Sequence, residues 1–211
     1  MRKGRVLSLK NFNQIIEFVV KNRVLLILSI FFITGFIISV FVSGKYELFK
    51  NWNIALLNDF IDDRSDKTFL SIATKSFFNS MLFILLGFAC GSSVLGSVFI
   101  PVIVLFKSFL FGGMAAILYA DYSLKGIAFY TVLILPSAII FVFGFLYAMC
   151  EAFNFSLMLT RLTLPQTMPI NISFQFRTFS FKYLIVTFII VFSALADALL
   201  CGNFLMVFNL D

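Results

Sequence analysis

The stretch "VLLILSIFFITGFIISVFV", Val24 to Val42, carries no charged side chain and is followed by the polar residues Ser43, Gly44 and Lys45. A helix needs roughly 20 apolar residues to cross about 30 Å of hydrocarbon, so this stretch predicts a membrane-spanning helix over 24–42. The rest of the chain agrees, because its 211 residues are 61% hydrophobic and 12% charged, with a mean hydropathy of +1.05. Such a composition excludes an ordinary soluble domain.

Four further apolar runs predict membrane helices over about 77–95, 99–120, 127–150 and 183–208. The first two come from one uncharged run, Phe77 to Val104, which is too long for a single helix. Glycine, serine and proline gather in it between Gly91 and Pro101, so we expect a break there. The turn "DYSLKG" separates the next two helices. The predicted fold class is all-α: a polytopic membrane protein of about five transmembrane helices, with the last four forming a bundle over 77–211.

Two segments outside these spans have an amphipathic pattern. Within residues 1–23, "KNFNQIIEFVVKNR" places apolar residues at helical spacing and basic residues beside them. We expect an interfacial helix there that orients the first span, with partner binding as the alternative. Residues 43–76 form a loop in which "ELFKNWNIALLNDF" predicts a second amphipathic helix. Trp52 is its expected anchor at headgroup depth.

The distribution of lysine and arginine predicts the orientation. Basic residues crowd into segment 1–23 and recur in the loop 151–182, whereas the loop 43–76 is close to neutral. Cytoplasmic loops carry the excess of positive charge, so we expect a cytoplasmic N-terminus and an extracytoplasmic C-terminus. A cleaved signal peptide is the alternative for the first span, but its apolar core is longer than usual and begins only at Val24.

Catalytic patterns are missing from the sequence. The chain has no histidine, the commonest general base and zinc ligand, and its three cysteines are isolated in or beside apolar runs. The acidic residues Asp62, Asp63 and Asp66 lack the spacing of a calcium loop. We therefore predict no enzymatic activity, no cofactor and no metal site. We expect the basic residues to contact membrane lipids and not nucleic acid.

Small residues recur four apart within the spans, which lets helix backbones approach closely. The predicted helix-packing residues are Gly87, Gly91, Ser108, Gly112, Ala116, Gly144 and Ala148. The pattern does not tell which helices meet, and it leaves self-association open.

Three charged residues within or beside the spans are candidates for buried charges: Lys107, Glu151 and Asp197. A lysine deep in a span is costly, so Lys107 is expected to face protein, a cavity or a route to the surface. Its side chain could extend to the inner headgroups, pair with Asp197 or Glu151, or line a path for ions or protons. The sequence leaves these three alternatives open.

The order of four motifs carries a family resemblance. These are "ILLGFACGSSVLG" from Ile84, "PVIVLFKSFLFGG" from Pro101, "LILPSAIIFVFGF" from Leu133 and "NFSLMLTRL" from Asn154. Together with the basic lead-in and the first loop, they resemble stage II sporulation protein M of endospore-forming bacteria over nearly the whole chain. Ser108 departs from the glycine that is usual in that family.

The resemblance implies a non-enzymatic membrane scaffold that works in forespore engulfment. Such a protein would lie in the mother-cell membrane at the sporulation septum and join two peptidoglycan-degrading partners, stage II sporulation proteins D and P. The alternative from another class is a transporter or channel subunit with a polar path near Lys107 and Asp197.

Overall fold

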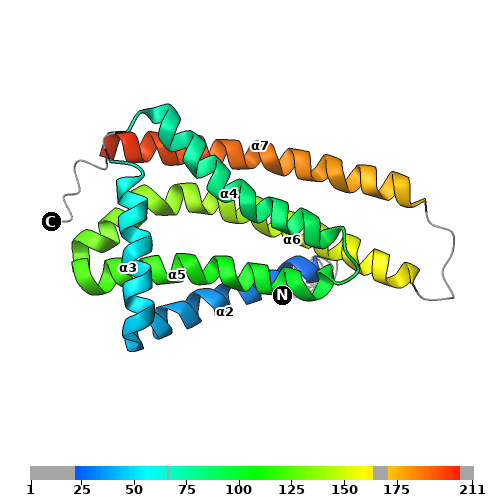
Figure 1. The fold of residues 1–211 in the computed structure, drawn as a ribbon, viewed down its shortest axis with the longest axis horizontal. Coiled ribbons are helices and arrows are strands. Elements are labelled where there is room, and N and C mark those ends of the chain that lie inside the picture. Colours follow the sequence, from blue (N-terminus) through cyan, green and yellow to red (C-terminus); the bar gives the residue numbers. More distant parts are fainter. Residues whose placement is uncertain (1–21, 66, 164–170, 205–211) are drawn as a thin grey trace, which may run out of the picture.

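The computed structural model describes residues 22–65, 67–163 and 171–204, and these residues fold into a bundle of long helices without strands (Figure 1). The predicted all-α class is therefore confirmed. The helices are α2 (Arg23–Lys45), α3 (Glu47–Asp62), α4 (Phe69–Gly91), α5 (Gly96–Phe129), the short π-helix η1 (Tyr130–Ile134), α6 (Leu135–Leu162) and α7 (Ile172–Phe204). The predicted interfacial helix within residues 1–23 lies outside the described residues except for Asn22 and Arg23, where α2 begins.

Four continuous helical stretches in the described part are long and apolar enough to span a membrane. The third stretch, Gly96–Leu162, contains two passes, because α5 and α6 run in opposite directions (Figure 1). The chain reverses near Ser123, which has a positive φ of 48°. Gly126 makes the bend possible, since a Cβ there would collide with the carbonyl oxygen of Leu118. The bend falls within the predicted turn "DYSLKG", and the described residues therefore make five passes through the bundle.

The predicted break after the second span is also present. Helix α4 ends at Gly91 and α5 begins at Gly96, and the turn between them is held by α6. The Ser156 hydroxyl donates a hydrogen bond to the Ser93 carbonyl (2.8 Å) and accepts one from the Ser97 amide (2.8 Å). Two backbone groups of the turn thus find a hydrogen-bond partner on α6.

The helices extend further than the apolar runs that predicted them. Helix α4 already begins at Phe69, within the predicted loop 43–76. The predicted loop 151–182 is mostly helical, because α6 continues to Leu162 and α7 starts at Ile172. Hydropathy marks only the apolar part of a helix, whereas propagation adds one hydrogen bond per residue regardless of polarity. All three extensions carry polar and charged side chains beyond the apolar spans.

The two ends of the bundle differ (Figure 1). At one end α3 crosses over α5 and α2, close to the bend near Ser123, the start of α4 and the end of α7. At the other end lie the α4–α5 turn, the end of α6 and the start of α7, and α6 and α7 project furthest there. Helix α2 begins on that side, so the first and last described helices start and finish at opposite ends.

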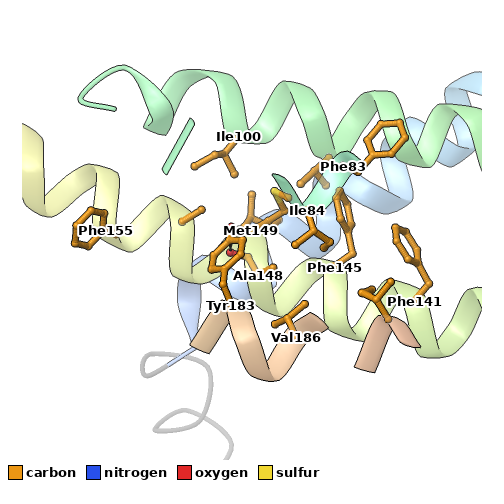
Figure 2. Close-up of a cluster of buried hydrophobic side chains, with 14 of the residues drawn as sticks. Phe83, Ile84, Ile100, Phe141, Phe145, Ala148, Met149, Phe155, Tyr183 and Val186 are labelled. Carbon is orange, nitrogen blue, oxygen red and sulfur yellow. Dashed lines mark hydrogen bonds between the residues drawn. The ribbon is translucent and has the colours of Figure 1, made fainter. Parts of the chain in front are cut away.

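The main core lies where α4, α5, α6 and α7 meet, and much of it is aromatic (Figure 2). Phe155 and Phe179 stack with ring centroids 4.6 Å apart, and Tyr183 donates a hydrogen bond to the Ala148 carbonyl (3.0 Å). A second cluster, which includes Leu57 of α3, fills the end of the bundle beneath that helix. Most remaining apolar side chains face outward, as lipid contact requires.

Candidate functional site

Lys107 lies on α5 inside the bundle, with only 8% of its surface exposed. Its ammonium is 4.1 Å from the ring centroid of Phe83, 5.1 Å from that of Phe141 and 5.3 Å from that of Phe111. Phe83 and Phe141 belong to the main core (Figure 2). Ring faces attract a cation electrostatically, by about 2 kcal/mol or more where water is excluded. Three aromatic rings therefore surround this buried charge.

Asp197 is buried on α7, and its partner is Arg64, which follows the end of α3. The carboxylate Oδ2 is 2.6 Å from Nη2 of Arg64, and the two side chains are 5% and 11% exposed. Arg64 also donates a hydrogen bond from Nη1 to the Phe60 carbonyl (3.2 Å), and its guanidinium lies 3.6 Å from the Phe60 ring centroid. This ion pair ties α3 to α7.

Glu151 lies on α6 near the opposite end of the bundle, and its partner is Lys182 of α7, with Oε2 and Nζ 2.8 Å apart. Both candidate carboxylates thus meet cations other than Lys107. Among the described residues Lys107 forms no ion pair, so the alternative in which it pairs with Asp197 or Glu151 is not observed, and aromatic rings contact it instead. Because Lys107 is buried inside the bundle, the alternative in which its side chain extends to the inner headgroups is not observed either.

Lys107 lines a cavity of about 550 Å³ between α3, α4 and α5. The polar lining residues are Asp59, Asp63, Arg64, Lys75, Ser76, Asn79 and Lys107. The apolar ones are Leu56, Phe60, Phe78, Leu82, Leu110, Phe111 and Met114. The cavity therefore connects the buried lysine with the charged residues at the α3 end. Asp197 does not line it.

Asp63 is the most heavily paired carboxylate of this region. It accepts a hydrogen bond from Lys75 of α4 and lies 3.6 Å from Nζ of Lys67. Partial burial favours the neutral acid, but the Lys75 hydrogen bond and the two positive charges outweigh it. The pKa of Asp63 is consequently lower than its ordinary value.

The predicted packing residues of α5 lie against α2. A Cβ added to Gly112 would be 2.5 Å from the Phe36 carbonyl oxygen, so the two backbones touch there. Ser108 is fully buried beside Gly35, whereas Ala116 is half-buried. The Ser39 hydroxyl donates a hydrogen bond to the Phe109 carbonyl (2.6 Å). Contact and an interhelical hydrogen bond join these helices, as expected where lipid removes the hydrophobic drive.

The α2 side of this contact was missed by the sequence reasoning. Gly35, Ser39 and Ser43 are all buried and stand four apart, which is the same small-residue signal that was recognised in the later spans. The residues could have been found in the first span by applying that pattern to it.

The other predicted packing residues lie in the core between α4, α6 and α7. A Cβ on Gly87 would collide with the Met149 side chain, and one on Gly91 would be 2.9 Å from Cα of Ala152. Gly144 faces Ile189 of α7, and Ala148 is fully buried. The glycines of α4 therefore bring it against α6.

Asn53 holds α3 to the bundle and was also missed. Its amide nitrogen donates hydrogen bonds to the Ser43 hydroxyl (2.9 Å) and the Phe49 carbonyl (2.9 Å). A Cβ on Gly113 would collide with the Asn53 side chain, so Gly113 provides the space for it. Trp52, the predicted interface anchor, is exposed on the outward face of α3.

In a comparison with protein families, the family of stage II sporulation protein M matches residues 28–201. The chain belongs to this family. No curated protein and no solved structure gives a significant match. The matched range includes α3, the buried residues Lys107 and Asp197, and the partly exposed Glu151, so the candidate site lies inside the region that matches the family. The protein is therefore a multi-pass membrane protein of a sporulation family.

Proposed function

We propose that the protein is a non-enzymatic membrane scaffold for a peptidoglycan-degrading complex in forespore engulfment. The observation that supports this role is the family match over residues 28–201. The partners in this proposal are stage II sporulation proteins D and P, and the location is the mother-cell membrane at the septum. The N-terminus is cytoplasmic, and the α3 end of the bundle faces the cell wall.

Helix α3 is the surface that we assign to partner contact. Its inward face buries Asn53 and Leu57, whereas Leu48 on its outward face is 85% exposed, with Trp52 exposed one turn further along. Asn53 fixes the middle of the helix and Arg64 fixes its end. A helix held in this way presents its outward side chains in one orientation, which lowers the entropy lost on binding.

The role itself is tested by deletion of the gene in its native host, followed by membrane-dye microscopy of sporulating cells. We expect arrested engulfment, with restoration by the unaltered gene in trans. Normal engulfment in the deletion strain would refute the role.

The contact surface is tested by co-purification with the two partners in detergent. Leu48→Arg adds a charge and length to the outward face of α3 and should reduce capture at least fivefold. Leu124→Arg is the matched control, because Leu124 is 82% exposed and lies next to Ser123 in the bend within α5. Equal capture by both variants would remove α3 from the proposal and leave the scaffold role to other surfaces.

The second candidate, a transporter or channel subunit, is favoured by one observation: the cavity that reaches Lys107. Asp197 pairs with Arg64 and does not line that cavity. A path for ions or protons through the cavity would therefore use Lys107 and not Asp197. Proteoliposomes would distinguish this function, through a proton or ion flux that Lys107→Met abolishes.

A further inference from the structure

The cavity beside Lys107 combines a buried positive charge with unused hydrogen-bond donors. Lys107 has no hydrogen-bond or ion-pair partner among the described residues, and its charge is stabilised by rings alone. The buried Nε of Arg64, another lining residue, also lacks a hydrogen-bond partner within the described ranges. Charged groups inside a protein are normally paired, so a lysine that lines a cavity without a carboxylate partner indicates a missing anion.

The remaining polar lining supports an acceptor with several oxygen atoms. Asn79 and Ser76 of α4 offer an amide and a hydroxyl. Two carboxylates line the cavity. Asp63 forms ion pairs with Lys75 and Lys67, and Asp59 lies on the exposed side of α3. Neither carboxylate forms an ion pair with Lys107.

The cavity extends along the helices from the α3 end towards the middle of the bundle. Lys75 and Leu82 mark its extent on α4, and Met114 and Lys107 mark it on α5. Seven residues at roughly 1.5 Å each give a length of about 10 Å. Half of the lining is apolar, and Leu82 belongs to the lipid-facing side of α4. A molecule with an anionic group and an apolar part can therefore enter from the membrane.

We propose that this cavity binds a phosphate-type oxyanion, with Lys107 as its central cation and Arg64, Ser76 and Asn79 as hydrogen-bond donors. Two sources share this chemistry: the headgroup of an anionic phospholipid and a soluble phosphate. Charge-assisted hydrogen bonds to an oxyanion are about twice as strong as neutral ones. Arg64 is already paired with Asp197, whereas Lys107 has no carboxylate partner, so we expect Lys107 to contribute most to the affinity. The site is independent of the proposed scaffold role, which requires no ligand.

The test uses the full chain, purified and delipidated in a neutral detergent. Binding of phosphatidylglycerol is measured by native mass spectrometry, with phosphatidylcholine as the neutral reference and inorganic phosphate as competitor. Lys107→Met, which keeps the length of the side chain, should weaken phosphatidylglycerol binding at least tenfold. Lys125→Met is the matched control, because it removes the same charge from an exposed position outside the cavity.

The arms of the experiment separate the two sources. Binding of phosphatidylglycerol that millimolar phosphate does not displace identifies a lipid headgroup, whereas saturable binding of phosphate itself identifies a soluble anion. Either result supports the site if Lys107→Met loses it and Lys125→Met retains it. Failure of the wild-type protein to bind either probe, or equal binding by Lys107→Met, overturns the proposal.

A purely structural role for Lys107 predicts a different pattern. In that case Lys107→Met would lower the melting temperature equally with and without phosphatidylglycerol. The binding site predicts instead that the lipid raises the melting temperature of the wild type and not of the variant. If Lys107→Met does not fold, phosphatidylglycerol binding is measured with Asn79→Leu instead. Asn79 lines the cavity but is exposed, so its replacement should not prevent folding. Undiminished binding by Asn79→Leu would then count against the site.

Discussion

Arg64 and Asp197 stand 133 residues apart in the chain, yet their side chains form a buried ion pair at 2.6 Å. The pair joins the residue that follows α3 to the last helix of the bundle. A buried ion pair contributes little net stability relative to apolar residues, but loss of one partner leaves the other charge without compensation. The pair therefore makes the attachment of α3 to α7 sensitive to single substitutions.

The first prediction concerns this pair. Asp197→Asn leaves the Arg64 guanidinium buried without a counter-charge and should lower the free energy of unfolding by about 3–5 kcal/mol. The double variant Asp197→Asn with Arg64→Met should recover much of that loss. Thermal unfolding in detergent, followed by circular dichroism, measures both.

The control for this prediction is the exposed pair of Lys50 and Asp121, in which Nζ and Oδ1 are 2.8 Å apart. Asp121→Asn should cost less than about 1 kcal/mol, because solvent screens exposed ion pairs. If Asp121→Asn and Asp197→Asn lower the free energy of unfolding by similar amounts, burial is not what makes the Arg64–Asp197 pair sensitive to substitution.

The second prediction concerns the contact between α2 and α5. Gly112→Ala places a Cβ 2.5 Å from the Phe36 carbonyl oxygen, which is closer than real Cβ contacts come, so the two helices must move apart. We expect a clear drop in melting temperature. Gly44→Ala is the matched control, because nothing lies within 4 Å of the added methyl group.

Gly44 lies within α2, where alanine is favoured over glycine by about 0.5–1 kcal/mol, so Gly44→Ala should be neutral or stabilising. A Gly112→Ala variant as stable as the wild type would show that α2 and α5 do not pack as closely as described.

The third prediction concerns the seat of α3. Asn53→Leu removes the hydrogen bond to the Ser43 hydroxyl and places a branched side chain in the space beside Gly113. Helix α3 should detach, which faster backbone hydrogen exchange over residues 47–62 would report. Asn51→Leu changes an exposed position on the same helix and should leave exchange unaltered.

The fourth prediction concerns the pKa of Asp63. The Lys75 and Lys67 charges lower that pKa, so the carboxylate stabilises the folded state above its unfolded pKa of about 3.9. This contribution is lost as the pH falls through the folded pKa. Lys75→Met should raise the pKa of Asp63, which carboxyl NMR of the protein in detergent micelles can follow. An unchanged pKa in the variant would show that Lys75 does not set it.

The sequence predicted the membrane passes and their interruptions well, because both depend on local composition. The uncharged run at Val24 to Val42 lies within α2, and the glycine- and serine-rich stretch from Gly91 to Gly96 separates α4 from α5. Helix ends were less predictable. Helix α7 begins at Ile172, well before its apolar run, because a helix can continue through charged residues such as Arg177 and Lys182.

The environment of the candidate site could be predicted only in part. The sequence singled out Lys107 and Asp197 as unusual, but not most of their neighbours, because Phe83, Phe141 and Arg64 come from distant segments. The rings around Lys107 belong to three helices, and the chain contains 31 phenylalanines with nothing to distinguish Phe83 or Phe141. Similarly, Arg64 stands in a charged loop where any of several cations could have met Asp197.

The way in which α3 is fastened has a mechanical consequence. Asn53 joins it to α2, and Arg64 joins it to α7. A force applied to α3 from outside the bundle is thus divided between the first and the last described helices instead of pulling one helix out of the membrane. The two connections lie at different points along α3, so they also oppose its rotation under load.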